Sequence, residues 1–535
     1  MANETEYVVV VHKDVNLEEF DAELAASTGE GPIPNREVKV ANPRWGSKRM
    51  THWMLTDAEV NLLKTDERVL TVEIPADQRT DITIGLHATQ TGIWYRGAST
   101  NSDHKNWGLR RVIAEANSGI FDNATTLTGD YTHQLTGTGV DFVVQDSGIQ
   151  ADHPEFQDAA GVSRVQEIDW FTGSGIVGET QDQNFYTDYD GHGTHCAGIA
   201  AGKTFGWAKN SRVYSQKLGG LEGTSDPNSG ISITNAFDTI RIWHNNKSID
   251  PVTGYKRPTV VNMSWGYGTT KIEDPASGTY RGAAWTYGVD YSTRAELESA
   301  TGVNINRTTI ADNPAVAISV RVTSVDAEIE EMISDGIHVI IAAGNNYNKI
   351  DSATGSDYNN QVVFGSTTYS YHRGSSPYST NAFMVASSDT TVDGSNLDKT
   401  SIYSSRGPGC NIWAPGTYIM SATSNDYNVN KFTPINYGPN ASYKQMSISG
   451  TSMAAPQVAG LCCLHLEVFP DLAPAEIQKR ILGESKEVMS TTSADNDYQN
   501  VTTSIMGQST KFLYSKYNSA TPWVLTGPSN ISIGN

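Results

Sequence analysis

Short apolar runs alternate with stretches of helical periodicity along most of the chain, and this alternation limits the fold more than any other feature. Val140–Val144, Val260–Met263 and Val339–Ala343 have the length and composition of buried strands. Helical periodicity occurs at Ala327–Ile333 and, with a more apolar composition, at Pro456–Phe469. Buried strands that alternate with helices form a parallel sheet that is covered on both faces. The sequence therefore predicts an α/β fold with a mostly parallel central sheet flanked by helices.

The N-terminal part has a pattern of its own, which predicts a small α+β domain over residues 7–78. Tyr7–His12 and Val69–Ile74 are β-branched runs and indicate strands. Thr56, followed three residues later by Glu59, matches a helix N-cap with its capping-box partner.

The other boundaries follow from changes in composition. Residues 79–106 are polar, with scattered Gly, Ser, Thr and Asn, and indicate a linker or extended arm. The main domain extends over residues 107–520. Two segments within it, near 267–320 and 346–382, are long for connections and are interpreted as insertions that form functional loops or small subdomains. Residues 521–535 form a polar tail.

Charge and hydropathy exclude two classes of partner. The 59 acidic residues outnumber the 38 basic ones, for a net charge of −21, and such a surface repels the phosphates of nucleic acids. The longest apolar runs fall short of the about eighteen residues that a membrane span needs.

The N-terminus lacks the pattern of a secretory signal peptide. The location stays open: intracellular, particle-associated or exported by another route.

Two motifs join an acid and a histidine to apolar elements. Asp146 ends an apolar strand and is followed by Gly148, which puts it at the sheet edge where α/β proteins build their sites. His192 stands between Gly191 and Gly193, and glycines permit close backbone approach around an imidazole. Taken singly, such an aspartate is more often a turn residue. The alternative interpretation of such a histidine is a metal ligand.

Two further motifs supply a hydroxyl and an amide. Ser452 precedes the apolar helix, where the helix dipole and free N–H groups favour an oxyanion. Its plain alternative is an N-cap serine. Asn345 ends the run Ala342-Ala343-Gly344 as an amide donor. A lipase or esterase would require G-x-S-x-G, but Ala454 occupies the last position of that pattern.

The sequence assigns no metal ligands. His192 and His195 are three residues apart without a nearby carboxylate, unlike the HExxH pattern, so His195 is interpreted as structural. The cysteines include no CxxC pair and are too few for a disulfide framework, so they are interpreted as buried small hydrophobes. They are Cys196, Cys410, Cys462 and Cys463.

Together the motifs occur in the order Asp, His, Ser, which is the chain order of subtilisin. From Trp107 to Asn518 the sequence resembles the subtilisin-like peptidases, and in its motifs the proteinase K branch most closely. The resemblance is carried by seven segments in order: DSG at Asp146, GHGTHCAG at Gly191, VNMSWG at Val261, AAGN at Ala342, YSSRGP at Tyr403, WAPG at Trp413 and SGTSMAAP at Ser449.

The resemblance implies a subtilisin-like fold and a serine endopeptidase whose catalytic triad is Asp146, His192 and Ser452, with Asn345 as oxyanion donor. Polypeptide substrates are expected to bind as an added β-strand. The residues implied at its two edges are Ser264, Trp265 and Gly266 on one side and Gly219 and Gly220 on the other. Two interpretations of Trp265 stay open. Its side chain either shapes the first substrate pocket or merely packs against its neighbours.

The resemblance also implies that residues 7–78 are an inhibitory prodomain, so that the protein is made as a zymogen and binds its own N-terminal part. No cofactor is expected in the chemistry. Any calcium is expected to be structural, and Asn411 stands where the branch has a calcium-ligand aspartate. The alternative is a structural or binding component of a larger assembly, such as a virus particle, on a protease fold.

Overall fold

The computed structural model shows a central sheet between two helical layers. It describes residues 4–26, 31–79, 82–86, 106–116, 133–181, 186–219, 230–269, 271–272, 277–303, 316–365, 367–427, 432–491 and 505–517. No helix within these ranges is both long and apolar enough to cross a membrane.

The central sheet has the strand order β24-β25-β20-β18-β15-β9-β6-β8-β7, with β19 paired to β18. The strands from β7 to β25 along this order pair in parallel, which confirms the expected mostly parallel sheet. The bounds are β6 Asp141–Asp146, β7 Val165–Gln166, β8 Arg212–Lys217, β9 Thr259–Met263, β15 His338–Ala342, β18 Phe383–Val392, β19 Asp398–Thr400, β20 Ile412–Pro415, β24 Lys486–Glu487 and β25 Lys511–Phe512.

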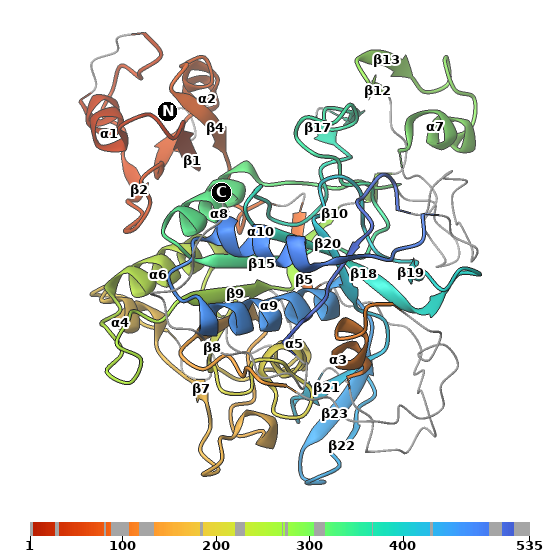
Figure 1. The fold of residues 1–535 in the computed structure, drawn as a ribbon. Coiled ribbons are helices and arrows are strands. Elements are labelled where there is room, and N and C mark those ends of the chain that lie inside the picture. Colours follow the sequence, from red (N-terminus) through yellow and green to blue (C-terminus); the bar gives the residue numbers. More distant parts are fainter. Residues whose placement is uncertain are drawn as a thin grey trace, which may run out of the picture.

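Helices cover both faces of this sheet (Figure 1). Helices α5 and α9 pack on one face, and α6 and α8 pack on the other. Every residue of the central strands β6, β9 and β15 is buried, which explains their nearly continuous apolar sequences. The helices are α3 Trp107–Val112, α4 Trp170–Ser174, α5 His192–Ala201, α6 Ile233–Asn246, α8 Thr323–Ser334, α9 Thr451–Val468 and α10 Pro474–Glu484. A small sheet of β21 Ile419–Thr423, β22 Ile435–Asn436 and β23 Lys444–Ile448 adjoins α5.

The N-terminal unit is a four-stranded sheet in the order β2-β3-β1-β4 with two helices. The predicted capping box is present, because Glu59 N donates to Thr56 Oγ1 and Thr56 N donates to Glu59 Oε2. Phe20, Leu24 and Trp53 belong to a hydrophobic core separate from that of the main domain. The elements are β1 Thr5–Val11, α1 Leu17–Ala25, β2 Val40–Asn42, β3 Met50–Leu55, α2 Asp57–Leu63 and β4 Val69–Glu73.

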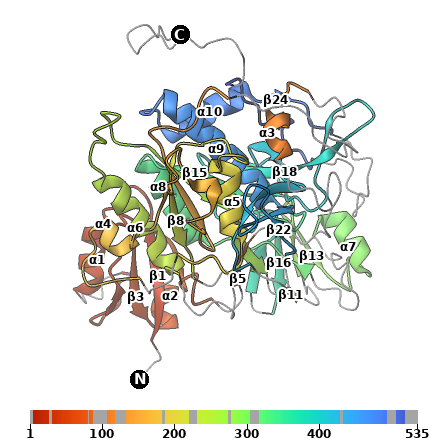
Figure 2. The ribbon, with the colours of Figure 1, turned by 90° about the horizontal axis from the view of Figure 1, so that it is seen from below.

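This unit sits on helices α6 and α8 through a buried ion-pair network (Figures 1 and 2). The guanidinium of Arg44 is buried between Asp238 of α6, at 2.9 Å, and Glu328 of α8. At the edge of this network, Arg49 pairs with the exposed side chain of Glu330 on α8 at 2.6 Å. Burial raises the pKa of Glu328, which is why the adjacent arginine matters for keeping the carboxylate charged.

A second contact joins the two parts at the start of α8. That helix has no side-chain cap of its own at Val322. Glu73 of β4 fills this role, since its Oε1 accepts a hydrogen bond of 2.6 Å from Ser324 N. A carboxylate at a helix N-terminus satisfies a free N–H group and is favoured by the helix dipole.

The segment expected to be a linker contains a strand that the sequence analysis did not predict. Strand β5, Ile82–Leu86, pairs antiparallel with strand β10, Trp265–Thr269. The run Ile-Thr-Ile-Gly-Leu is too short and too isolated among polar residues to stand out by periodicity. Its strand conformation depends on a partner nearly two hundred residues away.

The two insertions form one small sheet, in the order β13-β12-β16-β17, that stands apart from the N-terminal unit (Figures 1 and 2). Strand β12 of the first insertion pairs with β16 of the second. Trp285, Leu297 and Val362 lie in their shared core. The elements are β11 Lys271–Ile272, β12 Ser277–Tyr280, β13 Ala283–Thr286, α7 Arg294–Thr301, β14 Val316–Ala317, β16 Gln361–Phe364 and β17 Thr367–Ser370.

Candidate active site

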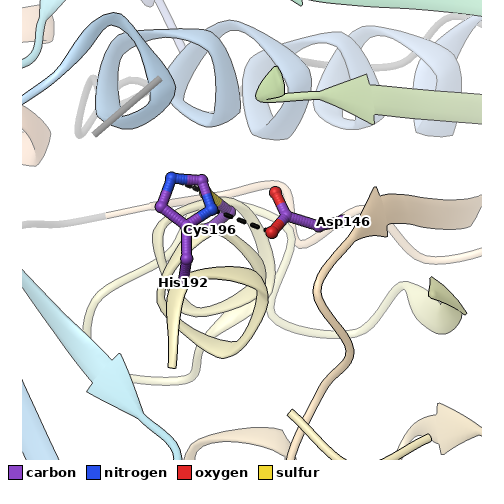
Figure 3. A group of neighbouring side chains, drawn as sticks. All are labelled: Asp146, His192 and Cys196. Carbon is purple, nitrogen blue, oxygen red and sulfur yellow. Dashed lines mark hydrogen bonds and ion pairs between the residues drawn. The ribbon is translucent and has the colours of Figure 1, made fainter. Parts of the chain in front are cut away.

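The centre of the site is a buried pair of Asp146 and His192 (Figure 3). Asp146 is the last residue of β6, and His192 is the first residue of α5. His192 Nδ1 donates to Asp146 Oδ1 at 2.8 Å, and both side chains are fully buried. Ser147 N also donates to Asp146 Oδ1, at 2.8 Å. The bond between His192 Nδ1 and Asp146 fixes the ring's tautomer, so that Nε2 is the basic nitrogen.

Glycines allow helix α5 to begin against the Asp146 loop. Gly191 has φ 86°, a left-handed conformation that glycine adopts without steric cost. A methyl group on Gly193 would lie 2.1 Å from Gly148 O, too close for any other residue. The close approach predicted from the flanking glycines is therefore present, and it brings the imidazole to the carboxylate.

Asp188 holds the two motifs together, and the sequence analysis missed it. This fully buried carboxylate accepts from Ser147 Oγ and Gly191 N at 2.8 Å each through Oδ1, and from Thr194 N at 2.8 Å through Oδ2. Burial raises its pKa, whereas the hydrogen bonds from Thr194 and Gly191 act in the opposite direction. The sequence signal that could have identified Asp188 is its place, as an acidic residue, just before the start of helix α5.

Cys196 lies one turn along α5, beneath the imidazole. Its Sγ is 3.8 Å from His192 Nδ1 and 4.0 Å from Nε2, and it donates to Ser452 O at 3.4 Å. Ligand atoms of Asp146, His192 and Cys196 lie within 4.8 Å of one another. Burial raises the pKa of the thiol well above its ordinary value, and His192 Nδ1 is already bonded to Asp146. These three side chains are therefore better described as a hydrogen-bonded His–Asp pair beside a neutral thiol than as a metal site. A metal site would need the cysteine as a thiolate.

Ser452 is the second residue of α9, which begins at Thr451 and not at Pro456 as expected from the sequence. Proline is favoured at helix starts, which explains the misplaced boundary. Inside the helix, Pro456 has no N–H to donate to Ser452 O four residues earlier. That carbonyl accepts instead from Ser264 Oγ, at 3.0 Å, and from the Cys196 thiol.

The Ser452 hydroxyl donates to Ser264 O at 2.9 Å. Cys196 contacts both Ser452 and His192, so these two residues share one neighbouring side chain. A hydroxyl rotates readily, and catalytic hydrogen bonds often form only when a ligand is bound. The Asp146–His192 pair and Ser452 are thus both in contact with Cys196, and the Ser452 hydroxyl itself is bonded to Ser264 O.

Asn345 lies three residues beyond the end of β15 and contacts the turn that carries Ser452. Its Oδ1 accepts from both the N–H and the hydroxyl of Thr451, at 2.9 Å each. Gly344 N in turn donates to Thr451 Oγ1 at 3.0 Å. With the amide oxygen held in this way, the orientation of the Nδ2 group is fixed relative to Ser452.

The residues expected at the substrate edges have different surroundings. Ser264 exchanges hydrogen bonds with Ser452, and Asn262 Nδ2 donates to Ser264 Oγ at 2.8 Å. Trp265 is fully buried and donates to Gln145 Oε1 at 3.2 Å, so it packs into the core. Gly266 is in β10, opposite β5. Gly219 N bonds to Ile231 O at 2.9 Å, and Gly220 lies outside the described residues.

His195 and the four cysteines have the surroundings of structural groups. His195 is fully buried, which lowers its pKa to about 3, and its Nε2 donates to Ile419 O and Met446 O. The four cysteines are buried and unpaired. Asn411, in the place of the expected calcium ligand, accepts from Met384 N at 2.6 Å through its side-chain oxygen.

Comparisons with known proteins show the family of the chain. The model of the subtilase family matches residues 137–504, more than half of the chain. The chain is 22% identical over 493 residues to "Subtilisin-like protease 3" of Saccharomyces cerevisiae, covering 89% of this chain and 79% of that protein. It is 26% identical over 381 residues to "Subtilase-type proteinase psp3" of Schizosaccharomyces pombe, covering 70% of this chain but 57% of the relative.

A solved structure supports the fold. The crystal structure of fervidolysin from Fervidobacterium pennivorans, a keratinolytic enzyme related to subtilisin, has a TM-score of 0.50 and 16% sequence identity, covering 95% of this chain and 60% of that one. At this identity the likeness concerns the fold alone. The family match, which spans all three residues of the Asp146, His192 and Ser452 site, identifies the chain as a member of the subtilase family.

Proposed function

We propose that the protein is a serine endopeptidase that hydrolyses peptide bonds in polypeptides through an acyl-enzyme on Ser452. The observation that carries the proposal is the buried pair of His192 and Asp146 beside a serine at a helix N-terminus. A free serine hydroxyl is a weak nucleophile and needs such a base.

Each member of the proposed triad has one role. His192 Nε2 takes the proton of Ser452 Oγ as the oxygen attacks the substrate carbonyl, and then gives it to the leaving amine. Asp146 holds the imidazole in the required tautomer and stabilises the imidazolium that forms. Water, deprotonated by the same imidazole, hydrolyses the ester and restores Ser452. None of these steps requires a metal, and any calcium would act on stability alone.

The negative charge of the tetrahedral intermediate is carried by the substrate oxygen. We assign the stabilisation of this charge to two hydrogen-bond donors, the Nδ2 group of Asn345 and the N–H of Ser452. Both groups lie at the turn that starts α9, and the contacts of Asn345 with Thr451 fix the amide before substrate binds. Donors that need no reorganisation during the reaction stabilise developing charge most effectively.

Replacing Asn345 with Ala should lower kcat by about 10²–10³-fold with little change in KM, the range established for this donor in subtilisin itself. The amide interacts with charge that is present in the transition state and not in bound substrate. Steady-state kinetics on a peptide substrate measures the effect. Asn345→Asp is the matched control, because it keeps an acceptor for Thr451 but loses the donor. Wild-type turnover in either variant would remove Asn345 from the oxyanion site.

We further propose that residues 7–78 are an inhibitory prodomain and that the protein is made as a zymogen. Support comes from the separate core of this unit, from the Arg44 network and from strand β5, which occupies the β10 edge where substrate is expected. A chain segment on that edge excludes a substrate strand, since each edge can pair once.

Covalent labelling tests the proposed activity. A fluorophosphonate probe should modify the processed protein at Ser452, as located by peptide mass mapping, and should leave Ser452→Ala unlabelled. Ser442→Ala, an exposed serine, serves as the control and should label fully. Absence of label on the processed protein, or label on another residue, would contradict the proposal.

A further inference from the structure

The segment that carries Asn345 contains an unusual backbone conformation. Tyr347, two residues further on, has φ 56°, in the left-handed region that bulky side chains seldom adopt. Its side chain is buried, so this conformation belongs to a packed part of the structure. A residue held in this way costs free energy and persists only where its surroundings fix it, and such residues gather at functional sites.

Arg406 is the side chain that packs on Tyr347. Its guanidinium carbon lies over the Tyr347 ring, 4.2 Å from the ring centroid. A guanidinium is attracted to an aromatic face, and more strongly where both groups are shielded from water. Arg406 is itself buried, and its Nη1 donates to Thr400 Oγ1 at 2.9 Å and to Ser401 O at 3.3 Å. These oxygen atoms set the position of the cation against which the ring packs.

Backbone hydrogen bonds join the two segments on both sides of this contact. Tyr347 N donates to Tyr403 O at 2.9 Å, and Arg406 N donates to Asn348 O at 3.1 Å. Ile350 N then donates to Arg406 O at 2.9 Å. The left-handed turn at Tyr347 directs the chain along residues 403–406, so that these donors and acceptors meet. The YSSRGP motif at Tyr403 thus has the Asn345 segment as its partner.

The two segments also meet on the other side of Asn345. Ser405 N donates to Gly344 O at 2.8 Å, and the Asn345 side-chain oxygen accepts from Thr451. Asn345 therefore lies between Gly344 and Tyr347, two points at which its segment is bonded to residues 403–406. The place of the Asn345 amide depends on both points.

We propose that Tyr347 and Arg406 are positioning residues, which set the place of the Asn345 amide for the oxyanion. Both act through Asn345 and do not themselves stabilise the intermediate. The inference rests on the proposed peptidase function with Asn345 as the oxyanion donor. It gives the YSSRGP motif, which supplies no member of the triad, a part in the reaction.

The physical reason is that an oxyanion donor is most effective when it does not have to move during the reaction. Residues 343–360, all of which the structure describes, form no helix and no strand beyond isolated bridges. Their geometry therefore depends on contacts with neighbouring segments. A displacement of about 1 Å at a reacting group lowers turnover by up to about 10²-fold.

An ion pair supports the same segment further along. Lys349 Nζ donates to Asp357 Oδ2 at 2.6 Å, and Arg281 of the first insertion donates to Asp357 Oδ1 at 2.6 Å. The Lys349 side chain is 24% exposed, however, whereas Arg406 is 2% exposed. Ion pairs that water reaches contribute less than buried contacts. The contact of Arg406 with Tyr347 is both more buried and closer to Asn345, so we expect it to dominate.

Tyr347→Gly tests the positioning role. Glycine adopts the left-handed conformation without steric cost, so the backbone path is still permitted, but the ring beneath Arg406 is lost. On a peptide substrate, kcat should fall by about five- to fiftyfold and KM should change by less than about twofold, because the misplaced amide acts on transition-state charge. Tyr347→Phe keeps the ring face, and its kcat should stay within about twofold of the wild type. The fluorophosphonate label counts the active molecules in each preparation.

A double-mutant cycle distinguishes positioning from a general effect on the fold. Asn345→Ala has no amide to position, so adding Tyr347→Gly to it should change kcat by less than about twofold. Asn396→Gly is the matched control, because Asn396 is an exposed residue with φ 61° in the turn between β18 and β19. It should keep the kcat of its parent in both backgrounds.

Arg406→Lys tests the other partner of the contact. Lysine keeps the charge but not the planar guanidinium, so kcat should fall as in Tyr347→Gly, and combining the two substitutions should cause little further loss. If the lysine variant does not fold, as judged by circular dichroism, the Tyr347 variants decide.

Three results would overturn the proposal in different ways. Wild-type kcat in Tyr347→Gly, or an equal loss with and without the Asn345 amide, would show that Tyr347 has no positioning role, while the peptidase function stands. Wild-type turnover in Asn345→Ala would remove the oxyanion donor on which the proposal rests. Absence of the fluorophosphonate label on processed wild-type protein would overturn the function itself.

Discussion

Replacing Ser452 with Ala should leave the chain uncut at its full 535 residues and lower turnover by about 10⁶-fold, the loss known for the nucleophile of subtilisin itself. The variant removes a single oxygen, which donates to Ser264 O. The rest of the site, including the His192–Asp146 pair, depends on other contacts and should persist. Intact mass reports processing, and release of product from a peptide substrate reports turnover.

Added wild-type enzyme provides the control for this variant. It should cut Ser452→Ala chains in trans without restoring fluorophosphonate labelling, because the cleavage site is intact and the nucleophile is missing. Spontaneous appearance of the cut fragment in Ser452→Ala alone would show that another group performs the cleavage.

Replacing Asp146 with Asn should lower kcat by about 10⁴-fold at neutral pH. The carboxylate accepts the Nδ1 proton of His192, and an amide can donate to that nitrogen and favour the wrong tautomer. The base that faces Ser452 would then carry a proton and could not accept another. Steady-state kinetics of the processed variant measures the loss.

Asp152→Asn is a suitable control for that experiment, because this nearby carboxylate is exposed. Its turnover should match the wild type, and both variants should keep the wild-type circular dichroism spectrum. A loss in Asp146→Asn smaller than about tenfold would show that this residue does not orient His192.

Much of the site could be predicted from sequence because its residues end elements with strong local signals. Asp146 follows an all-buried strand, and His192 lies between glycines that the structure shows in close backbone contact. Each of these positions is marked by a pattern that lies within a few residues of it in the sequence. The mostly parallel sheet was predictable for the same reason, since burial on both faces makes its strands uniformly apolar.

The features that the sequence did not reveal depend on distant partners. Strand β5 is defined by β10, and β12 by β16, and neither pairing leaves a local pattern. Asp188 has its role because Ser147 and Thr194 both come within hydrogen-bond distance of it. The helix start at Thr451 was missed because a proline in the second turn resembles a beginning.

The joining of the two insertions has a consequence for how this protein can change over time. Strand β12 lies between β13 and β16, and its residues share a core with Val362 from the second insertion. Loss of either insertion alone would leave the other with an unpaired edge and exposed apolar side chains, and such edges invite aggregation. The two segments therefore depend on each other for a closed core, although the central strand β15 separates them in the sequence.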